Sequence, residues 1–128
     1  MTLLLDTSIL VALEREDSFV KKKIGELSES KPPFISFISL FEFLYGLESL
    51  PLEKKANLKK FLWKFSVLHT TNETAMWLSY LKYCYVKQGK QKSLSDLFIA
   101  SQALEHKLTL VTRDKDFEDI SEIKKIMI

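Results

Sequence analysis

The stretch on which the interpretation of this chain depends is TLLLDTSIL, residues 2–10. It opens with an apolar run that is too short for a stable helix and that stops at an acidic residue, Asp6. A short continuous apolar run before a polar turn is typical of a strand buried on both faces of a parallel sheet. Helical spacing begins directly after Asp6, so the stretch predicts a strand that passes into a helix with a carboxylate at the junction.

The alternation of strand and helix continues to the end of the chain. Apolar and β-branched runs predict further strands at residues 34–37, 67–70, 108–112 and 123–128. Helical spacing and helix-end signals predict helices at residues 7–15, 18–30, 39–50, 52–65, 72–89 and 94–107. This alternation indicates an α/β fold with a central parallel sheet of about four to five strands and helices on both faces.

Length and composition limit the class of protein. The chain has 128 residues, 46% of them hydrophobic, and only three glycines and three prolines, so residues 1–128 are expected to form one compact domain. The single cysteine, Cys84, allows no internal disulfide, which favours a reducing, cytoplasmic location. No apolar run approaches the roughly 20 residues that a membrane span needs, so no membrane association is expected.

Two acidic residues follow predicted strands. Asp6 stands at the end of the first strand, and Asp114 comes shortly after the strand at residues 108–112. Each has an ordinary structural explanation, because Asp6 can cap the next helix and Asp114 can belong to an exposed turn. In open α/β sheets, however, binding sites form outside the carboxyl ends of the strands. Both carboxylates are therefore candidates for a site at that edge.

Two further acids lie near the starts of predicted helices. Glu42 follows Ser39, and Asp96 follows Ser93, at the spacing of a capping box. In a capping box, the serine and the acid satisfy free backbone N–H groups at the start of the helix. Local geometry alone therefore favours a structural role for both acids.

Other features suggest that these two acids face the interior. Asp96 shares a helical stripe with Ala100 and Ala103, two small residues suited to packing closely against a sheet. An inward carboxylate is costly unless it is paired or binds a cation. Glu42 lies one turn before Gly46, where two elements are expected to approach closely.

Carboxylates gathered from distant stretches at one sheet edge would repel one another strongly in a partly dry cleft. Divalent cations relieve that repulsion, and ligands that are all oxygen suit Mg²⁺ or Mn²⁺. The sequence contains no cluster of cysteine and histidine for zinc, and His69 and His106 are expected to be structural or surface residues. The pattern predicts a Mg²⁺ or Mn²⁺ site formed by Asp6, Glu42, Asp96 and Asp114.

Four segments of the chain resemble the PIN-domain family and, within it, the VapC toxins of toxin–antitoxin pairs. The segments are LLLDTSIL at residues 3–10, FISFISLFEFLYGL at 34–47, SLSDLFIASQAL at 93–104 and LTLVTRDKDF at 108–117. Their order and spacing span nearly the whole chain, and each carries its flanking apolar pattern. Together they are far more specific to the family than any single motif.

The resemblance implies a PIN-like three-layer α/β/α fold and a metal-dependent endoribonuclease that hydrolyses RNA. It implies that the catalytic and metal-binding residues are Asp6, Glu42, Asp96 and Asp114. Thr112 matches a hydroxyl that the family carries near the metals, and Ser8 would support Asp6. Asp116 matches a further acid of the family that would support the metal ligands without binding the metal directly. The likeness to VapC toxins also implies a homodimer that a small antitoxin protein holds inactive.

An acidic pocket needs basic residues around it to attract RNA. Lys90, Lys92, Arg113 and Lys115 are the candidates, and contacts of this kind depend on salt. The formal net charge of +2 does not by itself indicate a nucleic-acid binder, and most lysines are ordinary surface residues. Residues 34–65 carry more large apolar groups than two helices need to bury against a sheet. We expect this segment to contribute to dimerisation or antitoxin binding.

Three alternatives remain open at this point. The chain can be a PIN nuclease that acts in RNA maturation or decay with the same site chemistry. A small antitoxin-like gene directly upstream would instead favour the toxin. The chain can also be a non-catalytic binding module that keeps the fold, although the retention of all four acids argues against this. A Rossmann-like nucleotide-binding protein ranks lowest, because the sequence has no glycine-rich phosphate loop.

Overall fold

The computed structural model describes residues 1–29 and 31–128. A five-stranded sheet in the order β3-β2-β1-β4-β5 forms its centre, and every pair of neighbouring strands is parallel. The strands are β1 (Leu3–Leu5), β2 (Phe34–Ser36), β3 (Ser66–Leu68), β4 (Thr109–Thr112) and β5 (Lys124–Met127). The parallel sheet expected from the alternating pattern is confirmed, with each strand shorter than its predicted range.

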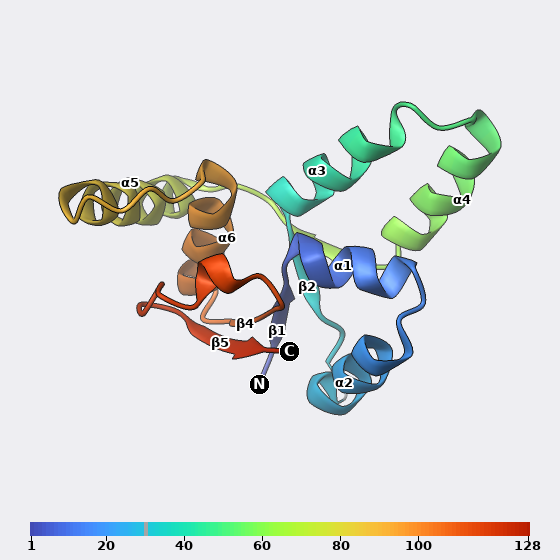
Figure 1. The fold of residues 1–128 in the computed structure, drawn as a ribbon, viewed down its shortest axis with the longest axis horizontal. Coiled ribbons are helices and arrows are strands. Elements are labelled where there is room, and N and C mark those ends of the chain that lie inside the picture. Colours follow the sequence, from blue (N-terminus) through green and yellow to red (C-terminus); the bar gives the residue numbers. More distant parts are fainter. Residues whose placement is uncertain (30) are drawn as a thin grey trace.

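Helices cover both faces of this sheet (Figure 1). They are α1 (Thr7–Glu14), α2 (Ser18–Ser28), α3 (Phe37–Leu47), α4 (Leu52–Leu62), α5 (Asn72–Lys87) and α6 (Leu94–Glu105), with a 3-10 turn, η1, at Lys115–Phe117. The predicted end of the second helix at residue 30 lies outside the described residues. None of the helices in the described ranges is long and apolar enough to cross a membrane.

The core forms two layers, one on each face of the sheet. Leu4 and Leu110 point to one face, where they pack with residues of α5 and α6, which include Leu81, Tyr85, Leu97 and Ala100. Leu3, Leu5 and Val111 point to the other face, where they pack with residues of α1 to α4, which include Ile9, Val20, Phe43 and Leu62. All three leucines of β1 are fully or almost fully buried. A strand covered on both faces needs a continuous apolar run, which explains the LLL of β1 and confirms the three-layer arrangement.

The start of α3 differs from the prediction. The helix begins two residues earlier, and its cap is Ser36, whose Oγ accepts a hydrogen bond from the Ile38 N–H at 3.2 Å. The expected capping box between Ser39 and Glu42 is therefore wrong. β2 runs directly into α3, so the extended residue at the end of the strand is already placed to cap the helix. This leaves the carboxylate of Glu42 free for a long-range contact.

Both ends of α5 have well-defined caps. Its N-cap is Thr71, which forms a capping box with Thr74. At the other end, Gly89 adopts φ +71°, a left-handed conformation that glycine readily takes after a helix. The Gly89 N–H donates to Val86 O at 3.0 Å and the Lys90 N–H to Tyr85 O at 2.9 Å. This pair of bonds is the Schellman motif, and it directs the chain into the basic loop before α6.

Candidate functional site

The candidate site lies where the sheet changes its order of connection. From β1 the chain moves outward on one side to β2 and β3, whereas β4 and β5 lie on the other side of β1. Ligand sites in open parallel sheets form at such a switch point, beyond the carboxyl ends of the strands. Asp6 directly follows β1, Thr112 ends β4, and Asp114 comes two residues later. Both strand-end acids predicted from the sequence therefore lie at this switch point.

Three carboxylates gather at this edge: Asp96 in the first turn of α6, Asp114 before η1, and Asp116 within it. One carboxylate oxygen from each lies within 4.8 Å of the others, and we call this group the carboxylate cluster. The Asp116 N–H donates to Asp114 Oδ1 at 2.9 Å, which fixes the turn that brings these two acids together. A donor set made only of carboxylate oxygens fits a hard divalent cation such as Mg²⁺ or Mn²⁺.

Asp6 is attached to the cluster by a chain of hydrogen bonds. It is only 2% exposed, and its Oδ1 accepts hydrogen bonds from Ser8 Oγ at 2.6 Å and from the Ile9 N–H at 3.0 Å. Its Oδ2 accepts a hydrogen bond from the Thr112 hydroxyl, whose oxygen in turn accepts the Asp114 N–H at 2.9 Å. Asp6 therefore caps α1 and also faces β4, so its structural role does not exclude a functional one.

The pKa values reflect this crowding of negative charge. Burial raises the pKa of Asp96 to about 6, and repulsion from Asp114, Asp116 and Asp6 adds to the shift, while the Ser93 hydroxyl opposes it. The pKa of Asp6 is also raised, mainly by burial and to a smaller extent by Asp114, against hydrogen bonds from its donors. The acids from β1, α6 and the loop after β4 thus interact with one another, and a bound cation would relieve the repulsion.

Glu42 reaches the same sheet edge by another route. Its Oε1 accepts a hydrogen bond from Thr7 Oγ1 at 2.8 Å, and the same hydroxyl lies 3.0 Å from Oγ of the buried Ser39. Thr7 directly follows Asp6, so Glu42 is held beside Asp6 and is not a member of the carboxylate cluster. The close approach expected at Gly46 is wrong, because no other described element lies within 4 Å of the position that a Cβ would take there.

The capping geometry of α6 leaves Asp96 available. Ser93 Oγ accepts the Asp96 N–H at 3.1 Å, as the predicted capping box requires. Among the described residues, the return bond from the Asp96 carboxylate to the Ser93 N–H is not formed, so the box is incomplete. Ala100 and Ala103 are buried, which confirms that this stripe of α6 faces inward.

The basic residues around the site differ in how firmly they are held. Lys92 donates to Asp116 O at 2.8 Å and also pairs with Asp119, whose other oxygen lies 3.7 Å from Lys90 Nζ. Arg113 pairs with Asp17 at 3.4 Å, and Lys115 is exposed. Lys90 and Lys92 therefore lie in the loop before α6, Arg113 and Lys115 flank Asp114, and the first three of these cations each pair with an acid.

Sequence reasoning missed two residues near the site. Arg15 and Thr7 line a cavity of about 390 Å³ together with Ser8 and Arg113, and it runs along α1 from the residues that follow Asp6. Thr7 belongs to the DTS triplet and was identifiable from its position beside Asp6. Arg15 carried no signal, since it stands at the far end of α1 and only the helix brings it to this face.

Comparison with known proteins gives the family of this chain. A family model of the PIN domain matches residues 3–123. The chain belongs to the PIN-domain family. The matched segment of this PIN domain contains Asp6, Glu42, Asp96 and Asp114. The family resemblance carried by the four sequence segments is therefore confirmed.

This PIN domain is similar in structure to chains of VapBC complexes. One match is a chain of VapBC2 from Rickettsia felis, in a complex bound to a DNA fragment from the VapBC2 promoter. It is 25% identical with a TM-score of 0.88, and the match covers 99% of this chain and 98% of that one. VapBC-1 from nontypeable Haemophilus influenzae is 23% identical, with a TM-score of 0.87 and the same coverage of 99% and 98%. DNA-bound VapBC from Salmonella typhimurium is 24% identical, with a TM-score of 0.86 and coverage of 99% and 98%. No curated protein sequence matches this PIN domain.

Proposed function

We propose that this PIN domain is a metal-dependent endoribonuclease that hydrolyses phosphodiester bonds of RNA. The observation that carries the proposal is the convergence of Asp96, Asp114 and Asp116 within 4.8 Å of one another. Asp6 is linked to Asp114 through the Thr112 hydroxyl. Bringing carboxylates together in a partly buried site is unfavourable for folding, and a bound cation would offset that cost.

The carboxylate cluster and Asp6 are the groups that would hold Mg²⁺ or Mn²⁺. A bound divalent cation supplies a lowered pKa for the attacking water and positive charge opposite the phosphoryl oxygens. Asp116 belongs directly to this ligand set, a closer role than the supporting one expected from the resemblance, because its oxygen lies as near as the others.

The remaining site residues position these ligands and the water. Ser8 and Thr112 hold both oxygens of Asp6, so the carboxylate keeps one orientation. Glu42, fixed by Thr7, orients the attacking water by accepting a hydrogen bond from it. No histidine is needed as a general base, because this chemistry relies on carboxylates and a cation.

RNA is drawn to the site by the cations at its border. Arg15 and Arg113 line the cavity beside Asp6 and bind phosphates of the RNA backbone there. Lys115 is exposed next to the carboxylate cluster and adds to this field. Because such contacts release counterions, RNA binding weakens as the salt concentration rises.

We further propose that the chain is the toxin of a VapBC-type pair. Its likeness over 99% of its length to chains of VapBC complexes supports a small antitoxin as partner. Exposed aromatic side chains on and just beyond α3 and α4 support a homodimer interface, and they include Phe37, Phe41, Tyr45 and Trp63. Phe41 and Tyr45 stack at 6.2 Å with an angle of 12° between their rings, which forms a flat apolar surface.

The nuclease proposal is tested by removing charge from the ligands without removing volume. Asp6→Asn and Asp96→Asn should each lower Mg²⁺-dependent cleavage of total RNA by at least roughly 100-fold, because each removes a charged ligand. Glu118→Gln is the matched control, since Glu118 is an exposed acid beside the same turn. Circular dichroism should show the same fold for all three variants. Full cleavage by both aspartate variants would overturn the assignment.

A further inference from the structure

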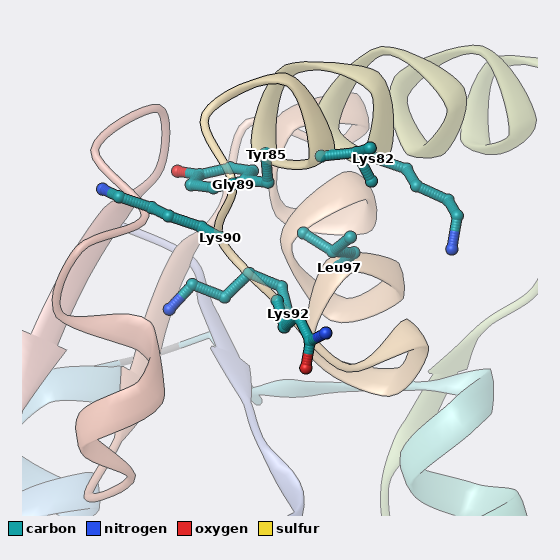
Figure 2. Close-up of a pocket in the computed structure, with 8 residues that line it drawn as sticks. Lys82, Tyr85, Gly89, Lys90, Lys92 and Leu97 are labelled. Atoms are coloured by element: carbon teal, nitrogen blue, oxygen red, sulfur yellow. The ribbon is translucent and has the colours of Figure 1, made fainter.

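Beside the carboxylate cluster lies a cavity of about 430 Å³ that the proposed reaction does not use (Figure 2). It is formed by the C-terminal end of α5, the loop at residues 89–92 and the start of α6. Its walls include Lys82, Tyr85, Val86, Lys90, Lys92 and Leu97. We propose that this cavity, named here the base pocket, binds one nucleobase of single-stranded RNA next to the cleaved bond. The inference rests on the proposed nuclease function.

The base pocket and the carboxylate cluster share structural elements. Lys92 lines the base pocket, and its ammonium group donates to the backbone oxygen of Asp116 at 2.8 Å. Leu97 also lines it and directly follows Asp96 in the first turns of α6. A nucleotide whose phosphate lies at the carboxylate cluster therefore has an adjoining nucleotide within reach of the base pocket.

The chemistry of the walls suits a flat ring with polar edges on a charged backbone. Val86 contributes exposed apolar surface, Leu97 and Tyr85 form a nearly buried floor, and Lys90 Nζ lies 6.0 Å from the centre of the Tyr85 ring. Gln91 offers an amide that can both donate and accept hydrogen bonds. Figure 2 shows Lys90 and Lys92 extending to one side and Lys82 to the other, with Leu97 between them. A base that enters here meets the apolar side of Val86 and the ammonium groups of the lysines, and cations along the backbone are typical of single-strand recognition.

The walls are held in place before any ligand arrives. The Tyr85 hydroxyl donates to Glu122 Oε1 at 2.7 Å and also lies 3.3 Å from the backbone oxygen of Asp119. Burial and the neighbouring Glu122 raise the pKa of Tyr85, so its hydroxyl stays a donor. Lys90 and Lys92 both pair with Asp119, which joins the loop to the segment after η1. A preorganised pocket loses little entropy on binding.

The geometry also selects the form of the RNA. A base inside a duplex is stacked and paired, so it can enter a pocket of this kind only after it leaves the stack. An unpaired loop or end presents its bases without that cost. The base pocket therefore favours single-stranded segments, and the neighbouring base influences which bond is cut.

The test places a bulky side chain in the base pocket by substituting an exposed residue at its border. Val86 is 66% exposed at its border, so Val86→Trp adds bulk there without disturbing the core. Met76→Trp is the matched control, because Met76 is 71% exposed on the same helix and does not line the base pocket. Both variants are made in an Asp96→Asn background to prevent cleavage. The probes are fluorescein-labelled RNA 12-mers of adenylate, cytidylate or uridylate and an abasic 12-mer, measured by anisotropy.

The best-bound 12-mer should bind at least about tenfold more tightly than the abasic chain, and Val86→Trp should remove most of that difference. Met76→Trp should leave it unchanged. With the acids intact, Val86→Trp should still cleave RNA but lose its preference for the neighbouring nucleotide. The base pocket is overturned if Val86→Trp and Met76→Trp bind the 12-mers equally well, or if Val86→Trp weakens binding of the abasic chain as much as that of the other 12-mers. Neither result would contradict the nuclease proposal. A protein that neither binds nor cleaves RNA overturns both proposals.

Discussion

The carboxylate cluster and the α3–α4 arm, residues 37–63, each gather side chains in an environment that does not suit them. The cluster holds charged groups partly away from water, and the arm exposes apolar groups to it. In the cluster the groups are charged and partly buried, and their neighbours fix them by hydrogen bonds between residues as far apart as Asp6 and Thr112. In the arm the groups are large and apolar and lie open to solvent, with Tyr45 73% and Trp63 60% exposed. Figure 1 shows α3 and α4 projecting away from the sheet, whereas α6 lies against it.

Each region therefore calls for a different kind of partner. Crowded carboxylates are relieved by a cation, which needs a rigid ligand set of the right spacing. Exposed aromatic surface is relieved by burial against another protein, which needs area more than exact geometry. Substitutions in each region should therefore have different consequences.

The largest effect separates the two faces of α3. Phe43 is 8% exposed and packs in the core, so Phe43→Ala should lower the free energy of unfolding by about 3 kcal/mol or more. Phe41 is 53% exposed, so Phe41→Ala should change it by under about 0.5 kcal/mol. Urea unfolding measures both. Light scattering should show weaker self-association for Phe41→Ala, and a wild-type chain that stays monomeric at high concentration would contradict the proposed dimer surface.

A smaller effect concerns the hydroxyl that connects Asp6 with Asp114. Thr112→Val removes the donor to Asp6 and the acceptor for the Asp114 N–H, so Mg²⁺ affinity should fall roughly 10- to 100-fold. Thr109→Val on the same strand is the control, because Thr109 lies at the other end of β4. Titration calorimetry with Mg²⁺ measures the affinity. Equal affinities for the two variants would show that Thr112 does not position the ligands.

The smallest effect is a gain in stability. Since the pKa of Asp96 is raised to about 6 in the folded state, its protonated form favours folding. That contribution is complete below about pH 4, near the usual pKa of aspartate, and is lost as the pH rises through about 6. Without metal at pH 8, Asp96→Asn should therefore be more stable than wild type by roughly 1–2 kcal/mol, a value reduced for partial solvent screening.

Thermal unfolding across the pH range measures this difference. It should disappear below about pH 4, where the wild-type carboxyl is protonated in both states. Added Mg²⁺ should stabilise the wild-type protein more than Asp96→Asn, because the ligand binds only the folded state. A wild-type protein as stable as Asp96→Asn in metal-free buffer at pH 8 would show that the cluster carries no such repulsion.

Much of the site could be predicted from local patterns. The strand-end positions of Asp6 and Asp114 followed from apolar runs that stop at an acid, and the inward stripe of Asp96 followed from Ala100 and Ala103. The capping box at Ser39 failed because local spacing alone could not tell that β2 leads directly into α3. The same spacing at Ser93 correctly gave the cap of α6.

The pattern of apolar residues was enough to place the alternating strands and helices, because a strand covered on both faces must be continuously apolar and a helix must repeat its apolar side chains every turn. Which acids are neighbours follows from the folded arrangement: Asp116 joins Asp96 and Asp114, while Thr7 holds Glu42 beside Asp6 and outside the carboxylate cluster. Distances of a few ångströms between carboxylates depend on strand order and on single hydrogen bonds, and these link residues far apart along the chain.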